Sequence, residues 1–181
     1  MADDGSKSLA SATSVDEDDA LQRLEQLFKW YTEQYQDPQN HDWSTSLVQN
    51  LSIVSHSASP PHPRVTFRFT VQPGHANLAG NLHGGCTSTL FDICTSLLLR
   101  FVSRPGFWQN TGVSRTLNVT YLRPAPVGAI VDVECEVVHA GQRLCSLRGV
   151  MRAATSDGTK GPVLAVCEHG KVNTDPPVEK L

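Results

Sequence analysis

The sequence has no cluster of basic residues and no long apolar run, and each absence excludes a class of function. Its 15 lysines and arginines are outnumbered by 18 aspartates and glutamates, which gives a net charge of −3. A protein whose main partner is nucleic acid needs clustered Lys and Arg to contact phosphates, so we do not expect such a partner. The longest apolar run, Leu97–Val102, is interrupted by Arg100 and is far too short to span a bilayer.

Cysteine pairs, metal-ligand spacings and targeting signals are also missing. The five cysteines show no CxxC spacing, the seven histidines show no HxH or HExxH spacing, and there is no GxSxG motif. We therefore expect free thiols, no metal site and no α/β-hydrolase fold. The N-terminus, MADDGSKSLASATSVDEDDA, has no apolar core for a signal peptide and is too acidic for a transit peptide. We expect a cytoplasmic location, and a mitochondrial one remains compatible with the sequence.

What the sequence does contain fits one globular domain. A chain of 181 residues with 39% hydrophobic residues is long enough to bury a core. Residues 1–14 are rich in Ser, Ala and Asp, and we expect them to be disordered. Residues 173–181 have the composition of a frayed tail. The expected domain spans residues 15–172.

Two segments have a helical pattern. Apolar residues recur at helical spacing after the capping-box pair Ser14 and Glu17, which predicts an amphipathic helix over roughly residues 16–36. The segment from about Gly84 to Ser103 is apolar on nearly every face, which predicts a helix that is buried almost all round.

Strand-like segments lie on both sides of the second helix. TSLVQNLSIVS and RVTFRFTV precede it, and four candidates follow it: Ser114–Leu122, Ala129–His139, Arg143–Ala154 and Val163–Val172. The short connections HAG and TSDGTKG predict antiparallel hairpins, and we expect the last four strands to form a meander. In one register Cys135 and Cys145 would face each other across a hairpin. Only the second helix is apolar enough to cover the sheet, so we expect an α+β domain with an antiparallel sheet curled around that helix.

Asp92 is a carboxylate in the middle of this apolar helix. Burying a carboxylate costs several kcal/mol unless it is hydrogen-bonded or neutralised. Asp92 could form a structural ion pair with Arg100 or Arg115, since such pairs also perturb acids. Alternatively, it could serve as a general base or nucleophile.

His83, Gly84 and Gly85 come directly before the same helix. The first N–H groups of a helix have no intrahelical partner, and together with the helix dipole they could stabilise an oxyanion. A tight turn explains the glycines equally well. Gly84 and Asp92 are eight residues apart, or ~12 Å along a helix, which is too far for both to act on one carbonyl. In a two-fold dimer with antiparallel central helices, Gly84 of one chain could face Asp92 of the other.

These residues together resemble the hotdog-fold thioesterases of the phenylacetate-pathway (PaaI-like) and mammalian thioesterase-superfamily-member type. The resemblance rests on HANLAGNLHGG, on Asp92 six residues later, and on GVSRTLNVTYLRPAPVG, and it covers about residues 46–172. It implies a helix wrapped by an antiparallel sheet, and a homodimer or a homotetramer built as a dimer of dimers. It also implies hydrolysis of acyl-CoA or acyl-carrier-protein thioesters, without a cofactor because CoA is part of the substrate.

The resemblance also implies roles for five residues. The N–H of Gly84, aided by Asn77, would polarise the thioester carbonyl. Asp92 of the partner chain would activate water, and Ser114 would orient that water. His83 would shape the loop or lie near the leaving sulfur. Considered alone, Asn77 could instead cap a turn and Ser114 could simply begin a strand.

Five further residues are candidate substrate contacts. Gly85 adjoins the proposed oxyanion site. Phe107 and Trp108, in the segment RFVSRPGFWQNT, could line an acyl pocket or cover the core. Arg123 and Arg143 lie at strand ends, where they could bind the CoA phosphates or remain solvated on the surface.

Two alternative functions stay open. A hotdog dehydratase or hydratase would use His83 as its base, although the His-Gly-Gly run and the place of Asp92 favour hydrolysis. A non-catalytic acyl-CoA-binding module has no need for a buried carboxylate.

Cys86 is near His83 but has no third orienting group, so we expect no Cys–His nucleophile. The sequence does not decide between fatty, aryl and polyketide acyl groups, nor whether the N-terminal helix is a lid, a dimer contact or plain packing.

Overall fold

Three helices and six strands form the fold in the computed structural model, which describes residues 17–34, 39, 43–59, 62–157 and 159–176. The helices are α1 (Glu17–Gln34), α2 (Thr45–Gln49) and α3 (Gly84–Leu98), and two 3₁₀ turns span Pro73–His75 and Leu99–Phe101. The strands are β1 (Leu51–Ser57), β2 (Arg64–Thr70), β3 (Val113–Tyr121), β4 (Ile130–Ala140), β5 (Leu144–Ala153) and β6 (Val163–Val172).

The strands form one antiparallel sheet in the order β1-β2-β4-β5-β6-β3. The expected meander of the last four strands is wrong, because β3 pairs with β6 and only β4, β5 and β6 are consecutive. The segment between β3 and β4, residues 122–129, contains two prolines and is too long for a tight hairpin, so it carries the chain across to the edge of β2. Cys135 lies opposite Gly149, and Cys145 lies opposite Ala140, so the expected Cys135–Cys145 facing pair is also wrong.

The segment TSLVQNLSIVS is only partly a strand. We expected one strand over its whole length, but Thr45–Gln49 is the short helix α2 and β1 begins at Leu51. The buried side chains in α2 belong to Thr45, Leu47 and Val48, a spacing that fits one turn of helix better than the strict alternation of a strand.

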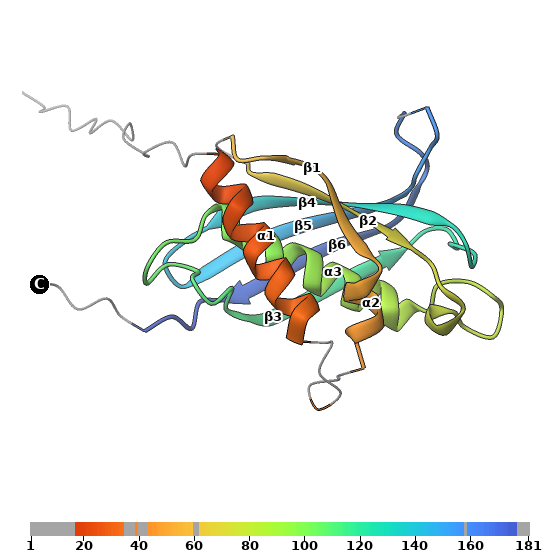
Figure 1. Ribbon diagram of the computed structural model, residues 1–181, viewed down its shortest axis with the longest axis horizontal. Helices are drawn as coiled ribbons and strands as arrows, with labels where there is room; N and C mark the ends of the chain where they lie inside the picture. The colour runs from red at the N-terminus through yellow and green to blue at the C-terminus, as the bar shows by residue number, and fades with distance from the viewer. Residues whose placement is uncertain (1–16, 35–38, 40–42, 60–61, 158, 177–181) are drawn as a thin grey trace, which may run out of the picture.

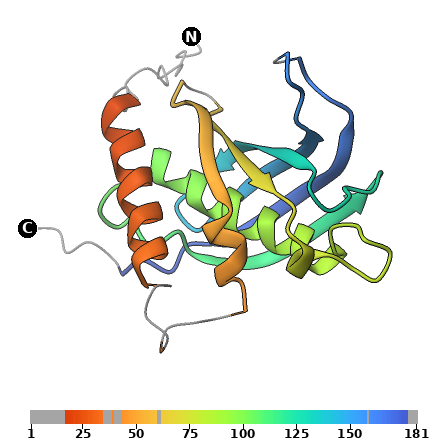
Figure 2. The same ribbon diagram turned by 45° about the vertical axis from the view of Figure 1, so that its right-hand side comes forward.

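Helix α3 packs into the concave side of the sheet, as predicted (Figure 2). Leu90, Phe91 and Leu98 are fully buried against the inward rows of the strands. The helix comes close to the sheet at Gly149 of β5, where an added Cβ would lie 2.5 Å from Cδ1 of Phe91. Any side chain at position 149 would therefore push α3 away from the sheet.

The opposite face of α3 is not buried, which corrects the expectation of a helix covered almost all round. The side chain of Asp92 is 42% exposed, and Ser88 and Ser96 on the same stripe are only partly covered. The sheet covers one face of the helix, and within the described part of the chain the remaining cover comes from α1 and α2.

Helix α1 crosses α3 on the side away from the sheet, as both views show (Figures 1 and 2). The predicted amphipathic helix is confirmed over Glu17–Gln34, with Ala20 and Leu24 fully buried. Ser14, residues 1–14 and residues 177–181 lie outside the described residues. Among the helices that the structure describes, none has the length and apolarity needed to cross a membrane.

The inward row of β6 ends in two polar side chains, His169 and Lys171, which are 1% and 3% exposed. His169 Nδ1 lies 2.7 Å from Oγ1 of Thr95, and Lys171 donates to Oγ of Ser96 at 2.7 Å. Burial, with a further contribution from the nearby Lys171 charge, lowers the pKa of His169 to about 4. Burial also lowers the pKa of Lys171.

The docking of α1 predicts a stability difference between two adjacent positions. Leu24→Ala removes a fully buried side chain and should lower the free energy of unfolding by about 2–4 kcal/mol. Glu25→Ala, at an exposed position of the same helix, should change it by less than about 0.5 kcal/mol. Urea unfolding of both variants measures the difference, and equal effects would mean that α1 is undocked in solution.

The buried His169 predicts a loss of stability in mild acid. In the unfolded chain this histidine takes up a proton near pH 6.5, whereas in the folded protein it stays neutral down to about pH 4. The unfolded state therefore binds more protons between these values, and the free energy of unfolding should fall by up to about 3 kcal/mol as the pH drops across this window. His169→Gln should show a shallower pH dependence in denaturant titrations from pH 7 to pH 4. Parallel curves for the variant and the wild type would refute the assignment.

Candidate active site

Asp92 is held from β3 by a short hydrogen bond. Ser114, near the start of that strand, donates its hydroxyl to Oδ1 of Asp92 at 2.5 Å. The pairing of β3 with β6 shifts register between Ser114 and Thr116, and such a bulge re-aims a side chain at the edge of a sheet. The two predicted residues therefore lie in direct contact, on the open side of α3.

His169 completes this cluster from β6. Its Nε2 lies 2.9 Å from Oγ of Ser114 and 3.2 Å from Oδ1 of Asp92. We assign the ring proton to Nε2, because this nitrogen faces a carboxylate and a bare lone pair there would be repelled. The hydroxyl of Thr95 then donates to Nδ1 rather than to the Phe91 carbonyl, 2.6 Å away. Ser114 thus donates to Oδ1 of Asp92, and Nε2 of His169, hydrogen-bonded to Ser114, lies beside the same oxygen.

Lys171 adds a positive charge to the same cluster. Its Nζ lies 3.4 Å from Oγ of Ser114 in addition to its bond to Ser96. His169 and Lys171 were not among the site residues predicted from the sequence. A signal was available, because strand alternation places them on the same face as the apolar Ala165 and Cys167. Two polar residues at the end of an apolar row indicate a buried polar cluster.

The N-terminus of α3 presents a different set of groups. Its N-cap is His83, whose Nδ1 accepts the N–H of Gly85 at 2.9 Å. The N–H of Gly84, the first residue of the helix, has no intrahelical acceptor. The structure shows no hydrogen bond to it within the described residues. Of the two glycines, Gly84 is therefore the one whose N–H remains for a ligand.

Asn77 organises the loop that leads to this helix end. Its Oδ1 accepts the backbone N–H groups of Ala79 and Asn81, at 2.9 and 3.2 Å. Asn77, Gly84 and Arg123 line one cavity of about 420 Å³. The side-chain amide of Asn77 keeps its N–H₂ donors for a ligand, because only its oxygen is used in the turn.

The two sets of groups lie at different places along α3. The cavity lined by Gly84 does not include Asp92, and the cavities lined by Asp92 and Ser114 do not include Gly84. Between them, the hydroxyl of Tyr121 contacts both Ser88 Oγ at 2.7 Å and the carbonyl of Gly84 at 3.0 Å. One chain thus carries two half-sites that it does not bring together.

The two aromatic candidates for substrate contact, Phe107 and Trp108, do not line the cavities at Asp92. Trp108 is fully buried and donates Nε1–H to the Gly141 carbonyl at 2.8 Å, so it covers the core. The guanidinium of Arg104 stacks on the ring of Phe107, 4.0 Å from its centroid. Neither aromatic ring lines the cavities at Asp92; the same segment contributes Thr111 there instead.

The two candidate phosphate ligands, Arg123 and Arg143, lie at opposite ends of the sheet. Arg143 precedes Leu144, which pairs with Val172 beside the start of β3, whereas Arg123 follows the end of β3. Nine residues of extended strand span about 30 Å, so one chain cannot bring both arginines to the same phosphate group. Arg123 donates to the Val163 carbonyl at 2.7 Å and shares the cavity of Gly84.

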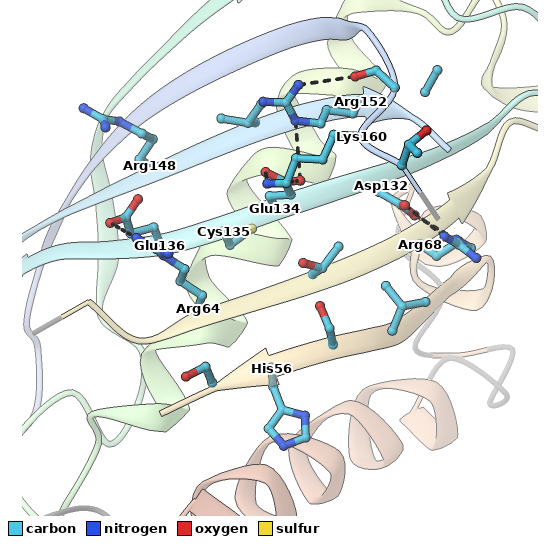
Figure 3. A pocket seen from close by; sticks show the side chains of 18 residues that line it. His56, Arg64, Arg68, Asp132, Glu134, Cys135, Glu136, Arg148, Arg152 and Lys160 are labelled. Atoms are coloured by element: carbon cyan, nitrogen blue, oxygen red, sulfur yellow. Dashed lines mark hydrogen bonds and ion pairs between the residues drawn. The ribbon is translucent and has the colours of Figure 1, made fainter. Parts of the chain in front are cut away.

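The outer face of the sheet carries a larger hollow, of about 690 Å³, lined by charged side chains (Figure 3). Its cations, which include Lys160 after β5, are matched by carboxylates of β4 and β6. The ion pairs are Arg64–Glu136, Arg68–Asp132, Arg148–Glu168, Arg152–Glu134 and Lys160–Glu134. Because every one of these cations is paired, the hollow is a solvated cross-strand ladder and not an anion site.

Comparisons with known proteins agree with this fold. The model of the thioesterase superfamily matches residues 79–159. Acyl-coenzyme A thioesterase 13 of Mus musculus is 29% identical over 125 residues, which are 69% of this chain and 81% of that protein.

Solved structures share the fold. Thioesterase superfamily member 2 of zebra fish has a TM-score of 0.66 at 23% identity, covering 82% of this chain and 96% of its own. A hypothetical thioesterase of Streptococcus pneumoniae, solved with coenzyme A, has a TM-score of 0.57 at 20% identity, covering 70% of this chain and 88% of its own. The chain is therefore similar to proteins of the thioesterase superfamily, and it has the hotdog fold that its sequence resemblance implied.

Proposed function

We propose that the protein hydrolyses acyl-CoA thioesters, with Asp92 as the general base. The observation that carries this proposal is a half-exposed carboxylate whose Oδ1 accepts the hydroxyl of Ser114, with Nε2 of His169 3.2 Å from the same oxygen. The name of the mouse relative, an acyl-coenzyme A thioesterase, and the coenzyme A in the streptococcal structure support the substrate class.

The reaction follows from which atoms are left free. Ser114 holds Oδ1 of Asp92 and His169 lies beside that oxygen, so Oδ2 can accept a proton from water while the water oxygen attacks the thioester carbonyl. Negative charge then develops on the carbonyl oxygen, which accepts the Gly84 N–H at the helix N-terminus. Collapse of this intermediate breaks the C–S bond, and the proton held by Asp92 passes to the thiolate.

A dimer is needed to bring the two half-sites together. Strand β3 lies at an edge of the sheet, and most of its residues are exposed, including Val113 (54%) and Tyr121 (53%). The open stripe of α3 lies beside it. We propose that two chains pair through β3, with their α3 helices antiparallel, so that Gly84 of one chain faces Asp92 of the other.

The geometry disfavours the two alternative functions. A dehydratase would need His83 as a base, but its Nδ1 already accepts the Gly85 N–H, so the neutral ring carries its proton on Nε2. That nitrogen is a donor, suited to a leaving thiolate. A pure binding module would gain nothing from donors that orient Asp92 while leaving one of its oxygens open.

The base assignment predicts the effect of one substitution. Asp92→Asn is nearly isosteric and can still accept from Ser114, so the fold should persist while kcat falls at least ~100-fold. Free-thiol release from a panel of acyl-CoA and acyl-carrier-protein thioesters measures it. Asp132→Asn, which changes a carboxylate on the outer face, should leave kcat unchanged. Near-normal turnover by Asp92→Asn would remove Asp92 from the mechanism.

The shared site predicts recovery of activity in mixed dimers. Gly84→Pro removes the oxyanion donor at the first helical position, where proline is tolerated. The backbone of His83 is already extended (φ −63°, ψ 138°), as a residue before proline prefers. Gly84→Pro and Asp92→Asn should each be inactive alone. Co-expressed, about half the dimers are mixed and one of their two sites is intact, so about a quarter of wild-type thiol release should return.

Gly84→Ala is the matched control for this experiment. It keeps the N–H, and its added Cβ would make an ordinary 3.5 Å contact with the ring of Tyr121, so it should stay active. Lack of recovery in mixed dimers that are verified by differential tags, with a folded proline variant, would rule out a site shared between chains.

A further inference from the structure

A cavity of about 400 Å³ leads from Asp92 to helix α1. This volume is within the range of small-molecule sites. Its walls come from five regions of the fold: α1, α2, α3, the start of β3 and the end of β6. Asp92 and Ser114 are therefore part of a chamber that the N-terminal helix helps to close.

The polar groups of this cavity cluster at its catalytic end. Ser96 lies one helical turn after Asp92, and Lys171 bridges Ser96 and Ser114. Asp92 and Lys171 are the two oppositely charged groups among the lining residues, and both belong to this cluster.

The wall away from this cluster is mostly apolar, and much of it belongs to α1. Leu27, Phe28 and Tyr31 line the cavity from one face of that helix, and Leu97 lines it from α3. The three α1 side chains are half-buried, which is consistent with one side facing a space that a ligand can fill.

We infer that this cavity binds the acyl group of the thioester. Phe28, with Leu27 and Tyr31 on the same face of α1, limits the length of the acyl chain that the cavity accepts. The inference rests on the proposed function, because it takes the reacting carbonyl to lie beside Asp92. Beyond the carbonyl, the chain runs from the polar cluster to the α1 wall. The substrates are acyl groups with a hydrocarbon end, since a charged end would be desolvated against that wall without a partner.

Helix α1 can be altered at this wall without losing its attachment. Its two fully buried residues, Ala20 and Leu24, lie one to two turns before Phe28, which is only partly buried against the core. A change of size at position 28 therefore alters the cavity more than the position of the helix. Gln26, on the exposed side of α1, offers a matched control.

The test is a chain-length profile of kcat/KM. Thiol release is measured for four substrates of increasing chain length: acetyl-, hexanoyl-, decanoyl- and palmitoyl-CoA. A dicarboxylic acyl-CoA, whose far end is charged, is measured beside them. Each further buried methylene should raise kcat/KM about fourfold until the cavity is full. The charged end of the dicarboxylic acyl-CoA should cancel this increase in kcat/KM. Phe28→Ala should move the optimum to longer chains, whereas Phe28→Trp should lower kcat/KM for the longer chains at least tenfold and leave acetyl-CoA unchanged. Gln26→Ala should reproduce the wild-type profile.

The outcomes separate the inference from the proposed function. An unchanged profile in both Phe28 variants, or an equal change for every chain length, would overturn the inference while leaving hydrolysis intact. Absence of thiol release by the wild type from every substrate would instead overturn the proposed function. Leu27→Phe narrows the same wall from the adjacent position and repeats the test if Phe28→Trp fails to fold.

Discussion

The packing of α3 against the concave face of the sheet is the contact on which the rest of this molecule depends. Phe91 lies against the backbone of Gly149, and the apolar rows of the strands cover that side of the helix. Because one face of α3 is used to build the core, its small and polar residues turn to the other side. This is the side that carries Asp92, so the same contact that forms the core also presents the carboxylate.

The buried end of β6 explains how that carboxylate is held. His169 and Lys171 lose their hydration, which costs free energy unless they are hydrogen-bonded. Thr95, Ser96 and Ser114 provide those bonds. The sequence allowed a structural ion pair of Asp92 with an arginine. In the described part of the chain the partners of Asp92 are instead a hydroxyl and an imidazole, which orient it and leave one oxygen open.

The proposed chemistry is divided between two places along α3, its N-terminus and the region around Asp92. The N-terminal end offers the Gly84 N–H and the cavity shared with Asn77 and Arg123, which suits the carbonyl and the CoA moiety. The middle of the helix combines Asp92 with an apolar chamber closed by α1, which suits the acyl group. The exposed edge strand β3 lies beside both places, so a second chain could bring the two half-sites together. The charged outer face plays no part, because its ion pairs satisfy one another.

The sequence by itself determined the long helices and the approximate strands, and it singled out Asp92 and Gly84 as candidates, because these follow from local periodicity and from short motifs. It did not determine that β3 pairs with β6, that Thr45–Gln49 is helical or that Trp108 belongs to the core, since these depend on contacts between distant segments. His169 and Lys171 show the reason most clearly. Alternation along β6 placed them on an inward face, but only the fold brought them within reach of Asp92, which is 77 residues before His169.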